Sequence, residues 1–87
     1  MKTLFSTLLI LAITSPAFAA KDCTNEPKEK YMKVEDFKKK VEGMGYKIDK
    51  FKTPGSCYEI YGKNAEGQKV EIYFNPVDAS IVKTEIH

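Results

Sequence analysis

The stretch Ser56–Pro76, SCYEIYGKNAEGQKVEIYFNP, carries the pattern that decides the fold of this chain. Apolar and polar residues alternate on both sides of a short polar segment, as in a β-hairpin with one buried face. Three-residue hairpin loops commonly end on a left-handed residue, and Gly67 supplies one at the end of Ala65–Gly67. This loop places Ile60 opposite Ile72, whereas a four-residue loop would mix the apolar and polar faces.

The hairpin register separates two faces of different chemistry. The apolar face is expected to pack on a helix and consists of Tyr58, Ile60, Val70, Ile72 and Phe74. The other face alternates tyrosine and glutamate, and such a face is ordinarily the half-solvated outer side of an antiparallel sheet. Exposed tyrosines are also preferred anchors in protein interfaces. The candidate protein-binding surface, called here the tyrosine–glutamate face, therefore consists of Glu59, Tyr61, Glu71 and Tyr73.

The residues before the hairpin change from an alternating to a helical period. Val34, Phe37, Val41 and Met44 recur at i, i+3, i+7 and i+10, which places them on one face of an α-helix. Gly45 is suited to a left-handed cap at the end of this helix. An amphipathic helix is therefore expected to lie against the apolar side of the sheet.

Two further strands are expected to flank the hairpin. In the strand that follows the helix, Ile48 and Phe51 are out of phase, which indicates a bulge or a strand end. The four expected strands are 46–52, 56–64, 68–75 and 80–86. The fold class is therefore α+β, with one amphipathic helix packed on a four-stranded antiparallel β-meander.

Residues 1–19 have the features of a targeting segment. Lys2 precedes a short apolar run, and Ala17–Ala19 matches the A-x-A pattern of a cleavage site. The apolar run is well short of the ~20 residues that span a bilayer, which argues against a membrane anchor. We expect residues 1–19 to be a cleaved signal peptide, residues 20–31 to be an irregular N-terminal arm, and the protein to be periplasmic or secreted.

Both cysteines, Cys23 and Cys57, lie after the expected cleavage site. Export to an oxidising compartment favours a disulfide between them. A pair of metal-binding or redox thiols is the alternative, but the spacing is far from C-x-x-C. A bridge would contribute roughly 3–4 kcal/mol in the chain-entropy model. This is a large share of the stability of a mature domain of only 87 − 19 = 68 residues.

Charge and histidine content limit the classes of function. Removing Lys2 from the 14 basic residues leaves 13 basic against 12 acidic residues, a net charge near +1. This balance does not indicate a nucleic-acid-binding surface, which requires a concentrated basic face. The only histidine is His87, so a histidine-based triad is not expected. Glu59 and Glu71 lie on neighbouring strands, but so small a sheet is expected to offer too little concavity to shift their pKa values. We therefore expect no enzyme, no catalytic or metal-binding residue and no cofactor.

The expected helix is followed by GMGYKI and then by CYEIYGKNAEGQKVEIYFNPVDASIVK. This succession resembles the PepSY domain in its short secreted form, over roughly Met32 to Ile86, within a PepSY-like domain of residues 32–87. The matching residues are Gly45, Tyr46, Ile48, Tyr58, Glu59, Ile60, Gly67, Val70, Glu71, Ile72, Tyr73, Phe74, Asn75, Pro76, Ile81 and Val82. Two positions depart from the family pattern. Ala79 replaces a turn glycine, which predicts a different turn, and Tyr31 stands where such proteins often carry tryptophan.

The resemblance implies a non-enzymatic binding domain, because PepSY domains occur in protease propeptides and in free-standing secreted proteins. It implies an unidentified protein partner, with a peptidase as the candidate, and neither nucleic-acid binding nor stable membrane insertion after cleavage. The alternative is an accessory protein of a membrane or electron-transfer system that acts by protein contact. The fourth strand is expected to be a free edge guarded by Lys83 and Glu85, which allows a monomer or a weak dimer.

Overall fold

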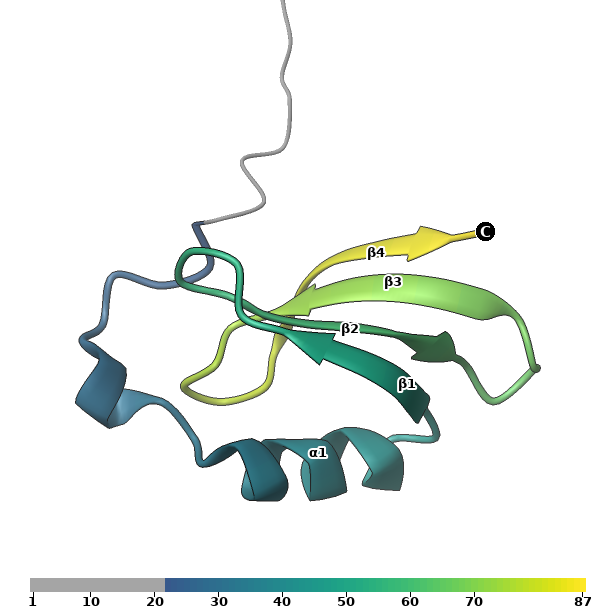
Figure 1. Cartoon of the computed structure of the whole chain (residues 1–87), viewed down its shortest axis with the longest axis horizontal. Helices are drawn as coiled ribbons and strands as arrows, with labels where there is room; N and C mark the ends of the chain where they lie inside the picture. The colour runs from purple at the N-terminus through teal and green to yellow at the C-terminus, as the bar shows by residue number, and fades with distance from the viewer. Residues whose placement is uncertain (1–21) are drawn as a thin grey trace, which may run out of the picture.

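The computed structural model describes residues 22–87, so the expected signal peptide and the first two residues of the arm lie outside the described residues. The elements are η1 (Lys28–Lys30), α1 (Val34–Gly43), β1 (Lys47–Lys52), β2 (Tyr58–Lys63), β3 (Lys69–Phe74) and β4 (Ile81–Ile86). The strands form one antiparallel sheet in the order β1-β2-β3-β4, with α1 on one side (Figure 1). The expected α+β fold is confirmed. Within residues 22–87, no helix has the length and apolar character needed to cross a bilayer.

The core lies between α1 and the apolar face of the hairpin. Phe37 and Val41 of α1 are fully buried, and the Phe37 ring centroid lies 4.8 Å from that of Tyr58 and 5.0 Å from that of Phe74. Both ring pairs are edge-to-face, a preferred geometry for aromatic side chains. The ends of the predicted apolar stripe, Val34 and Met44, are exposed, so only the two central residues anchor the helix.

The hairpin adopts the register expected from its sequence, with Ile60 opposite Ile72. The Asn64 N–H donates to the Gln68 carbonyl at 3.0 Å, and the Gly67 N–H donates to the Asn64 carbonyl at 3.0 Å. Gly67 has a φ of 83°, the left-handed conformation that a three-residue loop requires. The Asn64 side chain also accepts the Gln68 N–H at 2.9 Å, which stabilises the loop from inside.

The end of α1 is closed by two backbone hydrogen bonds around Gly45, whose φ is 100°. The Gly45 N–H donates to the Glu42 carbonyl at 3.0 Å, and the Tyr46 N–H donates to the Val41 carbonyl at 3.4 Å. This pair of bonds is a Schellman motif, which satisfies the last carbonyls of a helix and turns the chain. The predicted glycine cap is confirmed, and it directs β1 back across the sheet.

The bulge expected in β1 is present, because the register with β2 shifts between Ile48 and Lys50. Next to this bulge, β1 passes so close to Gly62 of β2 that a Cβ atom on Gly62 would overlap the carbonyl group of Lys47. Only glycine allows this approach of the two strands. Gly62 is therefore a steric requirement of the sheet rather than a flexible point.

The turn after β3 corrects one expectation. Ala79 has a φ of 64°, so the turn retains a left-handed residue although the family's glycine is absent. Its N–H donates to the Asn75 carbonyl at 2.8 Å, and the Asn75 N–H donates to the Ser80 carbonyl at 2.8 Å. Ala79 is only 3% exposed. Burial of its methyl group and these bonds offset the left-handed conformation, which costs an L-residue roughly 1–2 kcal/mol.

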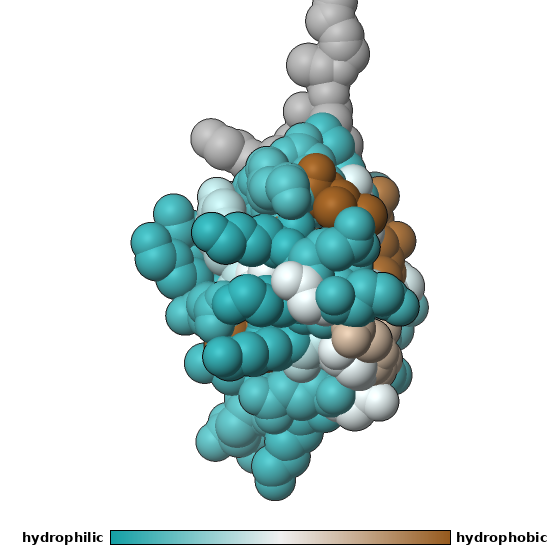
Figure 2. Space-filling model, turned by 90° about the vertical axis from the view of Figure 1, so that its right-hand side faces the viewer, coloured by the Kyte–Doolittle hydropathy of each residue, from teal (hydrophilic) through white to brown (hydrophobic). Residues whose placement is uncertain are grey.

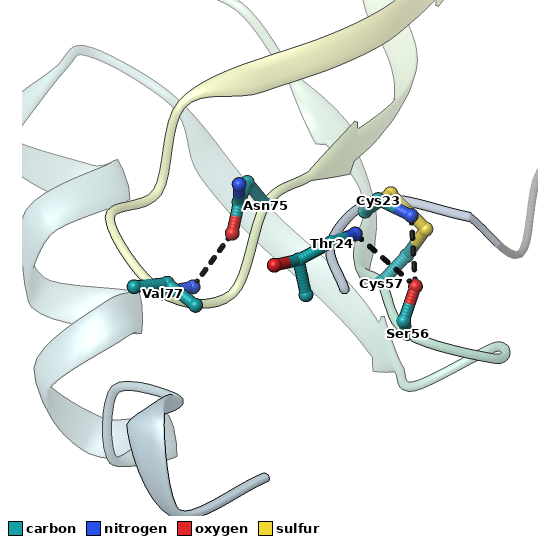
Figure 3. Close-up of a disulfide and its surroundings, with 6 residues drawn as sticks. All are labelled: Cys23, Thr24, Ser56, Cys57, Asn75 and Val77. Carbon is teal, nitrogen blue, oxygen red and sulfur yellow. Dashed lines mark hydrogen bonds between the residues drawn. A yellow bond between two sulfur atoms is a disulfide. The ribbon is translucent and has the colours of Figure 1, made fainter. Parts of the chain in front are cut away.

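A disulfide joins Cys23 of the arm to Cys57, the residue before β2, with the two Cα atoms 5.0 Å apart. This confirms the predicted bridge. The Ser56 Oγ accepts the N–H groups of Cys23 and Thr24 at 2.8 and 3.2 Å, so the arm is also held by hydrogen bonds (Figure 3). These contacts fix the start of the arm at one end of the sheet.

From the disulfide, the arm passes around the end of the sheet and enters α1 (Figure 1). Tyr31 packs edge-to-face on Tyr58 with ring centroids 5.8 Å apart, so tyrosine fills the position where tryptophan is common in the family. The Met32 N–H donates to the Pro76 carbonyl at 2.8 Å, and the Met32 carbonyl accepts the Tyr58 hydroxyl at 2.7 Å. Tyr31 and Met32 thus link the start of the helix to β2 and to the turn after β3.

The Gly62 contact gives a testable pair of substitutions. Gly62→Ala should lower the free energy of unfolding by about 2–3 kcal/mol, because β1 must move away from the new methyl group. Gly43→Ala in α1 is the matched control, since a Cβ atom there meets no atom within 4 Å. It should raise stability by up to about 1 kcal/mol through helix propensity. Urea unfolding of both variants measures the difference, and an equal effect of the two would contradict the steric argument.

Reduction of the disulfide should lower the free energy of unfolding by about 3–4 kcal/mol in the chain-entropy model. The bridge spans a sequence separation of 34 residues, and without it the unfolded chain gains freedom. Urea unfolding with and without a reducing agent measures the loss. A Cys23→Ser, Cys57→Ser variant should not respond to the reducing agent, and an unchanged wild-type midpoint would show that the bridge does not stabilise the fold.

Candidate functional site

The tyrosine–glutamate face lies on the side of the sheet away from the buried apolar face that packs on α1. The β2–β3 register pairs Glu59 with Tyr73 and Tyr61 with Glu71, so the structure brings all four predicted residues together. Tyr61, Glu71 and Tyr73 are partly exposed. Glu59 is only 3% exposed and is the one buried charged residue among residues 22–87. The accessible part of this face is therefore formed by the other three residues.

The carboxyl groups of Glu59 and Glu71 lie close enough to share a hydrogen bond, and this interaction shifts the pKa of both groups. Two carboxyl groups form such a bond only when one of them carries the proton. Burial, reinforced by the hydrogen bond to Glu71, raises the pKa of Glu59. The hydrogen bond from Glu59 is the main reason that the pKa of Glu71 falls to about 2. Glu59 is thus the protonated donor and Glu71 the ionised acceptor at mildly acidic pH.

Glu71 is the centre of the face because several donors converge on its carboxylate. The Tyr73 hydroxyl donates to Glu71 Oε2 at 2.9 Å, and His87 Nε2 lies 3.5 Å from Glu71 Oε1. A hydrogen bond to Glu71 raises the pKa of Tyr61 to about 12. The pKa of Tyr73 is also raised, mainly by burial and then by its bond to Glu71. Both phenols therefore remain protonated donors to one carboxylate.

These shifts correct the expectation that a small sheet offers too little concavity to perturb the two glutamates. Glu59 is buried on an open sheet face, where neighbouring side chains rather than a pocket remove water from its carboxyl group. One of its oxygen atoms, Oε2, is buried without a hydrogen-bond partner. Because Glu59 is hardly accessible, its proton can order the face but does not meet a substrate directly.

A second group of residues, which includes Glu71, was not predicted from the sequence. Glu71, Glu85 and His87 each offer one ligand atom, and these atoms lie within 4.8 Å of one another. Carboxylate and imidazole ligands of this kind could hold a divalent cation. The Tyr73 hydroxyl and the His87 imidazole already contact the two oxygens of Glu71, so the cluster is satisfied without an ion. The β3–β4 register, which pairs Glu71 with Glu85, was the signal that could have revealed the group.

A border of lysines surrounds the tyrosine–glutamate face. Lys52 lies opposite Glu59, and its Nζ lies 5.3 Å from the centroid of the Tyr61 ring. Tyr61 also lines a shallow open hollow with Lys50 and Lys69. In this lysine border, strand pairing places Lys47, Lys50, Lys52, Lys63, Lys69 and Lys83 on the outer side of the sheet. Overall composition did not reveal this local excess of positive charge, because acidic residues elsewhere balance it.

Figure 2 views the end of the molecule that carries the β2–β3 loop and the end of β4. Its surface is hydrophilic over most of its area, with hydrophobic residues gathered along one side. The exposed large hydrophobic residues of the described chain include three on β4, namely Ile81, Val82 and Ile86. The molecule thus carries a charged outer face and a separate apolar strip on its last strand.

Comparison with known families gives one match. A family model described as "Peptidase propeptide and YPEB domain" matches residues 3–85, which is nearly the whole chain. No curated protein shows a significant match, and no solved structure does. The match confirms the resemblance recognised in the order of helix, hairpin and turn.

The shared proton predicts how stability depends on pH. Folding raises the pKa of Glu59, so the unfolded chain releases this proton first as the pH rises, and stability is lost through the folded-state pKa. Glu59→Gln keeps an N–H donor for Glu71 but cannot ionise. Its unfolding free energy should depend less on pH than that of the wild type, which falls as the pH rises above the ordinary pKa of a glutamate.

Urea unfolding at a series of pH values measures this difference. Glu66→Gln, in the exposed β2–β3 loop, is the control and should keep the wild-type slope. Parallel profiles for Glu59→Gln and the wild type would show that Glu59 holds no extra proton in the folded state. A drop in stability below about pH 3 should persist in Glu59→Gln, because the pKa of Glu71 is lowered and its stabilisation is lost as it is protonated.

Proposed function

This chain belongs to the PepSY domain family, and we propose from this premise that it is an exported, non-enzymatic binding domain that restrains a peptidase by protein contact. The proposed contact surface is the accessible part of the tyrosine–glutamate face together with the lysine border. The family description names a peptidase propeptide, which supports a peptidase as the proposed class of partner.

The disulfide and the family both support an exported location for this function. PepSY domains are generally extracellular or periplasmic. The Cys23–Cys57 bridge is of the kind that forms and persists in oxidising compartments, where secreted peptidases also act. A small stapled domain is suited to this environment, because the bridge limits the opening that proteolysis requires.

The single observation that carries the proposal is that one partly exposed carboxylate, that of Glu71, holds the hydroxyl groups of two tyrosines. The Tyr73 hydroxyl donates to Glu71 at 2.9 Å, and a hydrogen bond to Glu71 is the main cause of the raised pKa of Tyr61. An aromatic side chain held in this way loses little conformational freedom when a partner binds, so less of the binding free energy is spent on ordering it. Tyrosines of this kind are common binding hot spots.

The charge around these tyrosines supports a partner with an acidic surface. The lysine border places positive charge next to Tyr61, with Lys52 above its ring. Complementary charge at the rim of an interface speeds association and excludes wrongly charged partners. The proposed partner is therefore a peptidase whose contact surface carries carboxylates around an aromatic or apolar centre.

An assay of casein hydrolysis tests the proposal. It uses the peptidases exported by the cells that produce this protein. Adding the purified, oxidised protein should slow hydrolysis, and Tyr61→Ala should raise the concentration needed for half inhibition by about tenfold or more. Met44→Ala is the matched control, because Met44 is an exposed apolar residue at the end of α1 and should retain full potency.

Two outcomes would count against this function in different ways. If the protein slows none of the exported peptidases at any concentration, the proposed restraint of a peptidase is wrong. If Tyr61→Ala is folded and as potent as the wild type, the domain contacts the peptidase through another surface. Circular dichroism and urea unfolding establish that each variant has the wild-type fold before potency is compared.

A further inference from the structure

The last strand, β4, is one of the two edge strands of the described sheet, and β1 is the other. Within residues 22–87, β4 pairs with β3 on one side and with no strand on the other. Figure 1 shows α1 beneath the β1 side of the sheet, away from β4. Three apolar side chains of β4 are consequently exposed: Ile81 by 43%, Val82 by 40% and Ile86 by 58%. An open strand with apolar side chains is a template for pairing with another strand.

We propose that two copies of this protein associate through antiparallel pairing of their β4 strands, with Thr84 of each copy on the two-fold axis. The occupant of the edge is thus a second copy of this chain. This pairing is supported by the outward direction of backbone groups on β4, by charge complementarity between the copies and by the exposed apolar residues. It is independent of any peptidase, because it uses the edge of the sheet and leaves the tyrosine–glutamate face accessible.

The backbone direction of β4 follows from its last hydrogen bond. The His87 N–H donates to the Lys69 carbonyl of β3 at 2.8 Å. In an antiparallel ladder the N–H and C=O groups of one residue point to the same side, and this side alternates along the strand. The backbone groups of Lys83 and Glu85 therefore point toward β3, as those of His87 do. Those of Thr84 and Ile86 point outward, toward a second copy.

Two β4 strands can pair symmetrically with Lys83, Thr84 or Glu85 on the two-fold axis. The charges of the facing side chains distinguish these three registers. A centre at Lys83 would place lysine against lysine, and a centre at Glu85 would place glutamate against glutamate. With Thr84 at the centre, Lys83 of each copy lies opposite Glu85 of the other, which forms two opposite-charge pairs on the outer face. Opposite charges directly across two strands stabilise the pairing, whereas like charges destabilise it.

The same register also joins the apolar residues of the strip. Val82 of each copy lies opposite Ile86 of the other, on the same side of the extended sheet as Thr84. In the single copy, Lys83 Nζ lies 3.1 Å from Glu85 of its own strand, so both charges are already held on the outer side. The register of β4 against β3 shifts next to Val82, which limits the regular segment. Short pairing of this kind gives a weak dimer, with a dissociation constant between about 10 μM and 1 mM.

Sedimentation equilibrium of the exported, oxidised protein tests the proposal. The wild type should show a concentration-dependent monomer–dimer equilibrium. Lys83→Glu alone and Glu85→Lys alone should each weaken self-association by about tenfold or more, because both cross-copy pairs become like-charged. An equimolar mixture of the two variants should associate as well as the wild type, since every cross-copy pair is again of opposite charge.

Backbone variants test the pairing independently of charge. Thr84→Pro removes an outward N–H that β3 does not use, so the fold should remain while the dimer is lost. Thr84→Ala keeps the N–H and should retain the dimer. Three results would overturn the proposal: a wild type that stays monomeric up to about 1 mM, single charge variants that mix without association, or a folded Thr84→Pro variant that dimerises like Thr84→Ala.

Discussion

The pairing of Ile60 with Ile72 is the constraint on which the rest of this structure depends. Because side chains alternate across a strand, this one pair assigns every residue of β2 and β3 to a face. The inner side chains meet Phe37 and Val41 of α1 and form the core. The same assignment forces Glu59 and Glu71 onto the outer side at diagonal positions, where their carboxyl groups meet. Core and candidate site are two consequences of one register.

On the outer face, Glu59 and Glu71 share a proton, which allows Glu59 to be buried. An ionised Glu59 would lack water around its carboxyl group, and protonation removes that penalty. The protonated Glu59 carboxyl group then acts as a donor to Glu71. The Glu71 carboxylate also accepts hydrogen bonds from the tyrosine hydroxyls. This network holds large side chains in place on an open surface. A surface held in this way is suited to protein recognition, because little order has to be gained when a partner arrives.

The tyrosine–glutamate face and the β4 edge differ in the chemical groups that they present to a partner. The tyrosine–glutamate face presents oriented hydroxyls within a border of lysines, which favours a partner of defined chemistry. The β4 edge presents backbone groups and a self-complementary Lys83 and Glu85, which favours a second copy. Since the β4 edge is separate from the tyrosine–glutamate face, a dimer paired through β4 would carry two such faces. Multivalent contact with a partner would then be geometrically available.

Local features of the sequence were sufficient to predict the fold. They also predicted the hairpin register, the glycine cap at Gly45 and the disulfide. Each depends on periodicity, on turn chemistry or on compartment, all of which can be derived from neighbouring residues. Tertiary structure decided the burial of Glu59, the position of His87 beside Glu71 and the left-handed Ala79. Desolvation and backbone strain are set by groups that are distant in sequence, so the surrounding fold has to be known before either can be evaluated.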